Sequence, residues 1–149
     1  VAPQDPNPFA DWSANLFMAG ATPHMIMTNT ASLYLLVVPA RGMNDERAFV
    51  RQILSSLQEM LVADGLQALH EQFIVPVMGT QEFSKSLNRS VSGSMNDLVV
   101  QAKSHLIGNP LPLLVASRRM NEAPMGAIQY ENPRSTLIRL AESQVPRTD

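Results

Sequence analysis

The sequence predicts an α+β domain in which a mostly antiparallel sheet of about four or five short strands packs against three or four helices. Apolar runs of strand length lie between amphipathic stretches, without the regular spacing of βαβ units. The chain has 149 residues, 45% of them hydrophobic and 16% charged, which suits one compact domain over residues 1–149.

The first residues are expected to form an extended arm, because residues 1–8 contain three prolines and no periodic pattern. Phe9, Trp12, Leu16 and Phe17 then recur at near-helical spacing, which predicts a short helix or turn that places the only tryptophan against the core.

A β-hairpin is predicted next, with residues 24–28 and 31–38 as its two arms and Asn29-Thr30 between them. Residues 33–38 are apolar on both faces, as expected of a central, covered strand. Pro39 ends this arm.

The clearest helix is predicted over residues 44–62, with Asn44 as its cap and Gly65 as its end. Residues 66–73 predict a second, shorter helix. The apolar stripe of the first helix consists of Phe49, Val50, Ile53, Leu54, Leu57, Met60 and Leu61.

The second half alternates short segments of both kinds. Strands are predicted at residues 74–78, where Pro76 favours an edge position, and at residues 113–119 and 127–130. One helix is expected to end near residue 107, before Gly108. Another begins at Asn132-Pro133 and runs to about residue 142, leaving residues 143–149 as a tail.

The richest polar stretch is Asn88-Arg89-Ser90-Val91-Ser92-Gly93-Ser94-Met95-Asn96-Asp97. Ser94 and Asp97 have the spacing of a capping box, so the stretch is expected to open the helix that ends before Gly108. A polar loop that leads into a helix N-terminus also suits an anionic ligand. Both interpretations, a helix cap and an anion site, remain open.

Composition excludes several classes of function. A net charge of -2 and a pI near 5.9 provide no basic surface for nucleic acid. No apolar run approaches the roughly 18 residues of a membrane span, and no signal peptide is visible. The absence of cysteine excludes disulfides and thiolate metal sites. We therefore expect a soluble, cytoplasmic protein without nucleic-acid or membrane partners.

No catalytic or metal-binding motif is present. His24, His70 and His105 are widely separated and lack the spacing of zinc ligands, so we expect no metal and no cofactor. Ser92-Gly93-Ser94 lacks the glycine pattern of a nucleophile elbow. The sequence also contains neither the phosphate-binding loop of nucleotide hydrolases nor the glycine fingerprint of dinucleotide-binding folds.

The chain resembles a bacterial family of small single-domain proteins that has no assigned function. The decapeptide at residues 88–97 is the most specific part of this resemblance, which extends from about Trp12 to Pro133. The weaker pieces are Trp12-x-x-Asn15-Leu16, the strand at residues 33–38 and Asn121-Glu122-x-Pro124-Met125. The resemblance implies a self-contained domain and brings no substrate, cofactor or catalytic residue.

The sequence thus favours a binding or interaction module with a site for a small anionic ligand. Arg89 would clamp a carboxylate or phosphate, and Asn96 would orient it. The predicted ligand-binding residues are Arg89, Ser90, Asn96, Asp97 and Asn121. The alternatives are a small hydrolase or transferase that uses the same loop, and a purely structural subunit in which Arg89 pairs internally.

A homodimer is also expected. The apolar segments at residues 24–28 and 74–78 are predicted to lie at sheet edges, and exposed edges of this kind are commonly covered by a partner chain.

Overall fold

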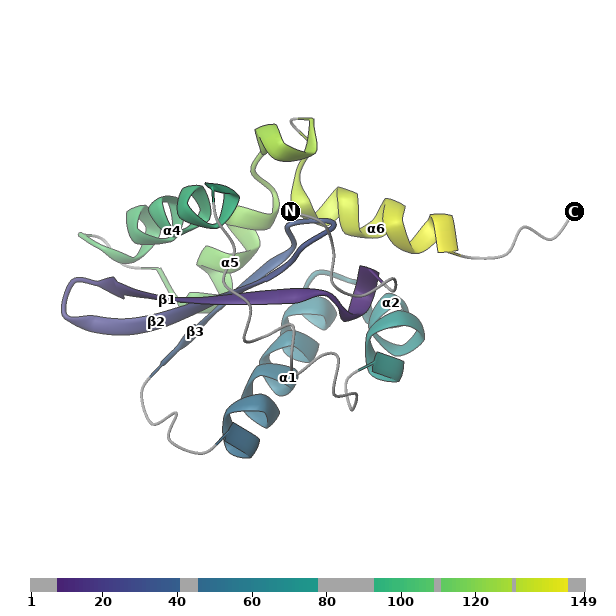
Figure 1. Cartoon of the computed structure of the whole chain (residues 1–149), viewed down its shortest axis with the longest axis horizontal. Coiled ribbons are helices and arrows are strands. Elements are labelled where there is room, and N and C mark those ends of the chain that lie inside the picture. Colours follow the sequence, from purple (N-terminus) through teal and green to yellow (C-terminus); the bar gives the residue numbers. More distant parts are fainter. Residues whose placement is uncertain (1–7, 41–45, 78–92, 109–110, 130, 145–149) are drawn as a thin grey trace, which may run out of the picture.

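The structure is a computed structural model that describes residues 8–40, 46–77, 93–108, 111–129 and 131–144. These residues form an α+β domain with a three-stranded antiparallel sheet and five α-helices (Figure 1). The predicted class is therefore correct. The described sheet is smaller than the predicted four or five strands, and the helices are more numerous than predicted.

The sheet is a meander in the order β1 (Trp12–Ala19), β2 (Thr22–Asn29) and β3 (Leu35–Pro39). β1 pairs with β2 over its whole length, and β2 pairs with β3 from Thr28↔Leu35 to His24↔Pro39. The predicted hairpin is thus confirmed as β2 and β3. Its second arm begins at Leu35 and not at residue 31, and it lies at an edge of the described sheet and not at the predicted central position. The predicted edge position of residues 24–28 is wrong, because they belong to the central strand.

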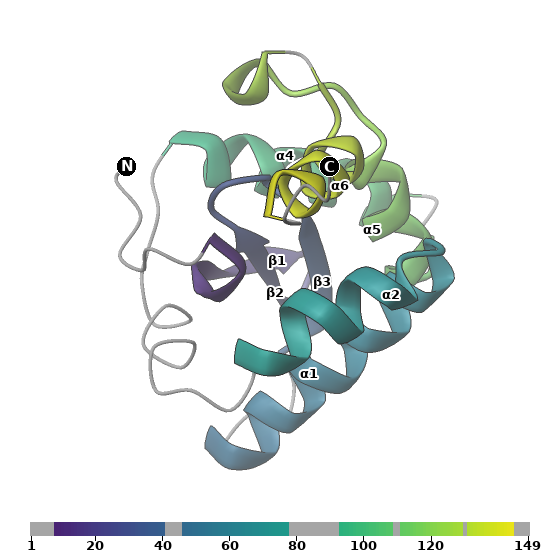
Figure 2. The same cartoon turned by 90° about the vertical axis from the view of Figure 1, so that its right-hand side faces the viewer.

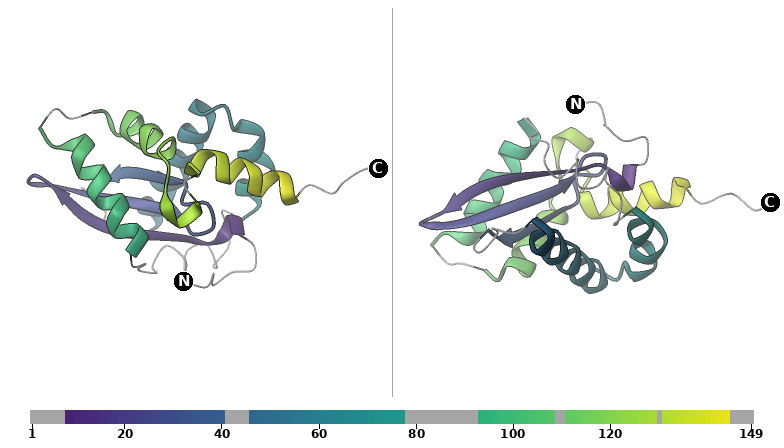
Figure 3. Two further views of the ribbon diagram at one scale, coloured as in Figure 1. Left: turned by 90° about the horizontal axis from the view of Figure 1, so that it is seen from above. Right: turned by 60° about the horizontal axis from the view of Figure 1, so that its bottom comes forward.

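Helices cover both faces of this sheet (Figures 2 and 3). On one face lie α1 (Glu46–Ala63) and the segment formed by α2 (Gln67–Leu69), the π-helical turn η2 (His70–Ile74) and the 3₁₀ turn η3 (Val75–Val77). On the other face lie α4 (Gly93–Leu106) and α5 (Leu113–Asn121). The remaining elements are η1 (Pro8–Ala10), η4 (Gly126–Ile128) and α6 (Pro133–Gln144).

Coverage on both faces explains why the predicted helix around Trp12 is a strand. Trp12 packs into the core on the α1 side, whereas Phe17 packs into the core on the α4 side. A strand that buries residues on both faces loses the apolar–polar alternation that identifies half-buried strands. The spacing of its large side chains therefore matched a helical period by coincidence.

Three of the predicted strands have other structures. Residues 113–119 lie in the helix α5, and residues 74–77 form the end of η2 and the turn η3. Residues 126–128 form η4, next to a single bridge between Met125 and Glu131. Short apolar runs fit strand and helix equally well, so periodicity could not separate them.

The two best-marked helices are confirmed. Ile53, Leu57 and Met60 are fully buried along α1, as the predicted stripe requires. α6 begins at Pro133, and Asn132 caps it because its Oδ1 accepts a hydrogen bond from the Ser135 amide at 2.7 Å. The predicted cap Asn44 lies outside the described residues.

Candidate functional site

One buried polar cluster of the described interior is centred on Asp64, which lies between the end of α1 at Ala63 and Gly65. Gly65 has φ +76°, and two backbone hydrogen bonds close the turn: Leu66 N to Leu61 O at 2.7 Å and Gly65 N to Val62 O at 3.0 Å. This pattern is a Schellman motif, which needs a left-handed residue after the cap. It places Asp64 at the C-cap.

A carboxylate is unfavourable at this end of a helix, because the C-terminal carbonyls carry partial negative charge. Asp64 is nevertheless buried, with only 1% of its side chain exposed. The Tyr34 hydroxyl donates a hydrogen bond to Asp64 Oδ2 at 2.6 Å, and Arg118 Nε donates one to Oδ1 at 2.9 Å. These two donors offset the cost of burying the charge.

A second arginine contacts the same residue through the backbone. Arg134, in the first turn of α6, donates a hydrogen bond from Nη2 to the carbonyl oxygen of Asp64 at 2.8 Å. It thereby satisfies one of the carbonyls that the end of α1 leaves without a helical partner. Asp64 therefore joins the end of α1 to the residue before β3 through Tyr34, to α5 through Arg118 and to α6 through Arg134.

Tyr34 is held in its neutral form. Burial raises the pKa of Tyr34 strongly, and the hydrogen bond to Asp64 and the charge of Asp64 raise it further. Arg134 and Arg118 act in the opposite direction. The cluster thus contains a neutral phenol, one carboxylate and two guanidinium groups.

Asn121 was predicted as a ligand-binding residue, and its observed contacts are internal. Its Nδ2 donates a hydrogen bond to Leu35 O and its Oδ1 accepts one from Leu35 N, both at 2.9 Å. One turn earlier on α5, Ser117 Oγ accepts a hydrogen bond from Val37 N at 3.0 Å. The buried side chains of Asn121 and Ser117 therefore form hydrogen bonds with backbone groups on the outer edge of β3.

The other predicted site residues are described only in part. Arg89 and Ser90 lie outside the described residues, and so does the side chain of Asn96. Asp97 is exposed on α4. Asp97 and Asn121 are the two predicted site residues whose side chains are described, and no hydrogen bond joins them.

The capping box is likewise not described. Neither the Ser94 side chain nor the predicted cap geometry at the start of α4 belongs to the described part of the chain. α4 begins at Gly93, so Ser94 is the second residue of the helix and not the predicted cap residue before it.

The three histidines are separate in the structure as well. His24 Nδ1 lies 3.1 Å from Thr22 O, and His24 stacks on Phe17. His70 is buried, and its Nε2 has no hydrogen-bond partner among the described residues. Within the described ranges, no three His, Asp or Glu side chains lie close enough to hold a metal ion.

Sequence reasoning missed all four members of the Asp64 cluster, although one signal was present. An aspartate directly before a helix-ending glycine opposes the helix dipole, so it requires a cationic partner. Arg118-Arg119 is the densest pair of basic residues in the chain. Only the folded structure shows that Arg118 is the partner.

The fold and this cluster define a small α+β domain with a covered three-stranded sheet and a carboxylate-centred polar interior. The profile of a protein family described as "Domain of unknown function (DUF6933)" matches residues 1–136. The chain belongs to this family. A comparison with curated proteins gave no match. In the described ranges, no helix is long and apolar enough to cross a membrane.

Proposed function

We propose that this protein is a binding module whose ligand is a small anion, held by Arg118 and Arg134 over Asp64. The observation that carries the proposal is the imbalance of charge at the cluster. Two guanidinium groups contact the single residue Asp64, and the Asp64 carboxylate is their one acidic partner among the described residues. Because Tyr34 stays neutral, one positive charge remains for a ligand.

Unused donors support the same proposal. Arg118 contacts Asp64 through Nε alone, which leaves its two terminal nitrogens without a partner among the described residues. Its side chain is 44% exposed, so a ligand can reach these nitrogens from solvent. Two N–H groups at the end of a guanidinium match the two oxygens of a carboxylate or the oxygens of a phosphate.

Asp64 has a positioning role in this proposal. A free arginine side chain loses about 2 kcal/mol of rotamer entropy when a ligand orders it. Arg118 is already oriented by its bond to the buried Asp64 carboxylate, which Tyr34 holds in place. Preorganisation of this kind favours binding.

The polar loop remains a second candidate for an anion site. α4 begins at Gly93, directly after the main part of the decapeptide, so the free amides of its first turn follow Arg89 and Ser90 in the chain. Asn96 and Asp97 would complete this second site, with Asn121 as a further candidate. A small hydrolase or transferase at this loop and a purely structural subunit are the competing functions.

Two further expectations remain proposals. A cytoplasmic location rests on composition. A homodimer would use β1, because β1 is an edge strand of the described sheet and exposes 68% of Leu16 and 51% of Met18. Light scattering tests the dimer, since a monomer mass throughout the micromolar range would contradict it.

Thermal unfolding in the presence of phosphate, acetate, succinate and citrate tests the proposed site. A ligand at 100 times its Kd stabilises a folded protein by about 2.7 kcal/mol. We expect one or more of these anions to raise the melting temperature of the wild-type protein. Arg118→Lys retains the charge beside Asp64 and loses the guanidinium fork, so it should lose most of this ligand-induced shift.

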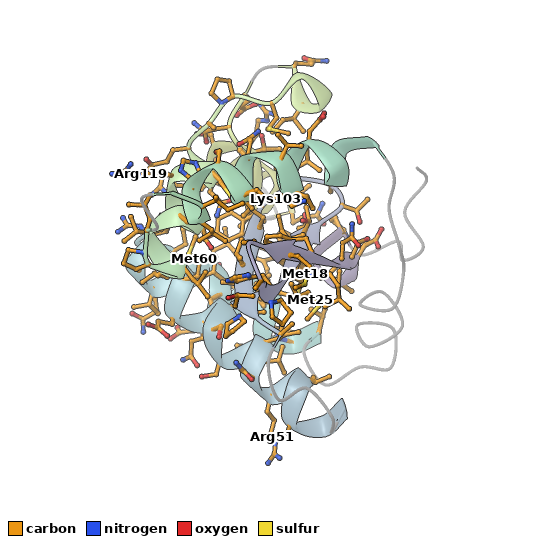
Figure 4. All side chains as sticks on the ribbon, turned by 90° about the vertical axis from the view of Figure 1, so that its left-hand side faces the viewer. Met18, Met25, Arg51, Met60, Lys103 and Arg119 are labelled. Atoms are coloured by element: carbon orange, nitrogen blue, oxygen red, sulfur yellow. The ribbon has the colours of Figure 1, made fainter. Side chains whose placement is uncertain are left out.

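Arg119→Lys is the matched control, because it makes the same chemical change at the next residue of α5. Arg119 is exposed and points away from the molecule (Figure 4). The variant Arg119→Lys should leave the anion-induced shift of the melting temperature unchanged. Equal shifts in wild type and both variants would mean that the anions bind elsewhere. Arg89→Lys then tests the loop.

A further inference from the structure

A pocket of about 480 Å³ lies between η1, the η2–η3 segment and the C-terminal end of α6. Figures 1 and 2 show these three parts of the chain at one end of the domain. This volume is within the usual range for small-molecule sites. The residues that line the pocket are Pro8, Phe9, Gln72, Phe73, Pro76, Val77 and Gln144.

The apolar part of the wall includes two aromatic rings, together with Pro8, Pro76 and Val77. Phe9 and Phe73 stack with ring centroids 4.8 Å apart and an angle of 25° between their planes. Phe9 is buried, whereas Phe73 is partly exposed on the pocket side of η2. Aromatic faces favour a further flat ring in offset stacking.

The polar part of the wall consists of amides. The carboxamides of Gln72 and Gln144 have no hydrogen-bond partner among the described residues, and each offers both donors and an acceptor. Pro76 has no N–H, so it cannot supply the helical hydrogen bond to the Gln72 carbonyl four residues earlier. The η2 segment is π-helical, and such turns occur frequently at functional sites.

Among the described residues, no Asp, Glu, Lys, Arg or His lines this pocket. The proposed anion site consists of charged guanidinium groups, whereas the polar groups of this pocket are neutral amides. The anion site also lies at the other end of α6. Arg134 is in the first turn of α6 and Gln144 is its last residue, so about 15 Å of helix separates the two. One small ligand is too short to occupy both.

We infer that this pocket binds a neutral, flat heteroaromatic ring with adjacent hydrogen-bond donors and acceptors, of the kind found in nucleobases and nicotinamide. The ring stacks on Phe73, and the two glutamine amides pair with its polar edge. The described wall carries no charge, which disfavours ionised ligands because their desolvation would not be compensated. The inference does not depend on the proposed anion site.

The chain contains its own reporter for this pocket. Trp12 is the only tryptophan, and its indole Nε1 donates a hydrogen bond to the Phe9 carbonyl at 2.7 Å. A ring that enters beside Phe9 changes the surroundings of this indole. Titration of the full chain with nicotinamide, and separately with cytosine, should therefore produce a saturable change in tryptophan fluorescence, after correction for absorption by the ligand.

The amide variants assign the signal to the pocket. Gln72→Ala and Gln144→Ala each remove one amide at an exposed position, and each should weaken binding about three- to tenfold. Gln67→Ala, an exposed glutamine outside the pocket, is the control and should bind like wild type. Circular dichroism verifies that all three variants are folded.

Three results would overturn the inference. The first is the absence of saturation with both rings at millimolar concentration. The second is the same affinity in wild type and both pocket variants. The third is a response to a ligand of another class. An equal response to toluene, which has no polar edge, would be such a result, and so would displacement of the ring by a proline-rich peptide that binds more tightly.

Discussion

Asn121 pairs with both backbone groups of Leu35, because its carboxamide accepts from the amide and donates to the carbonyl, each at 2.9 Å. The side chain thus takes the place of a neighbouring strand. Ser117 does the same for the amide of Val37. Four residues along a helix advance about 6 Å and two residues along a strand about 6.7 Å, so the two contacts fit one helix face.

Asn121→Ala should destabilise the fold by about 2–4 kcal/mol, since it leaves a buried amide and a buried carbonyl without partners. Urea denaturation measures the loss. Glu122→Ala, at the adjacent exposed position, should change stability by less than about 0.5 kcal/mol. Equal effects of the two substitutions would mean that β3 needs no side chain at its edge.

Arg118→Ala removes one of the two side-chain partners of a buried carboxylate. Loss of the partner of a fully buried charge costs about 3–5 kcal/mol. Arg118 is partly exposed and Tyr34 stays in place, so we expect about 2 kcal/mol. Arg119→Ala should be nearly neutral. If Arg119→Ala destabilises as much as Arg118→Ala, the loss reflects helix α5 and not the Asp64 cluster.

Tyr34 should remain un-ionised at pH values where an exposed tyrosine has titrated, because its pKa is strongly raised in the folded state. The chain has two tyrosines. Ultraviolet difference absorbance should therefore show one of them ionising only when the protein unfolds. Tyr34→Phe removes this delayed step.

The same shift determines how stability responds to alkali. Above the usual tyrosine pKa of about 10, the unfolded chain releases the Tyr34 proton and the folded chain retains it. Stability should therefore fall as the pH rises above about 10, and the fall should be smaller in Tyr34→Phe. A fall of the same size in this variant would assign the effect to other groups.

His70 should make the fold sensitive to mild acid. Burial lowers the pKa of His70 in the folded state, and the charge of Glu71 opposes this only in part. Below the usual histidine pKa of about 6.5 the unfolded chain binds the proton more readily, so stability falls with falling pH. The slope from one group cannot exceed about 1.4 kcal/mol per pH unit.

His70→Leu tests this assignment, because Nε2 has no partner among the described residues and an apolar side chain of similar volume suits the site. We expect stability at pH 7.5 to be unchanged or raised. The pH dependence between 7 and 5.5 should become weaker. The same pH dependence in wild type and His70→Leu would assign the effect to other groups.

The sequence by itself determined the α+β class, the helices α1 and α6, and the hairpin of β2 and β3. Each of these rests on local physics that leaves a mark in neighbouring residues. The stripe through Ile53, Leu57 and Met60 follows the helical period, and Asn132-Pro133 combines a capping side chain with a fixed backbone angle.

Only the tertiary structure decided the state of the ambiguous apolar segments. Residues 12–19 form a strand because β2 pairs with them and helices cover both faces, and residues 113–121 form a helix because Ser117 and Asn121 face β3. The Asp64 cluster arises in the same way. Asp64 is 30 residues from Tyr34, 54 from Arg118 and 70 from Arg134, so no local pattern connects them. Burying a charge creates a demand for partners, and packing of the helices determines which residues meet it.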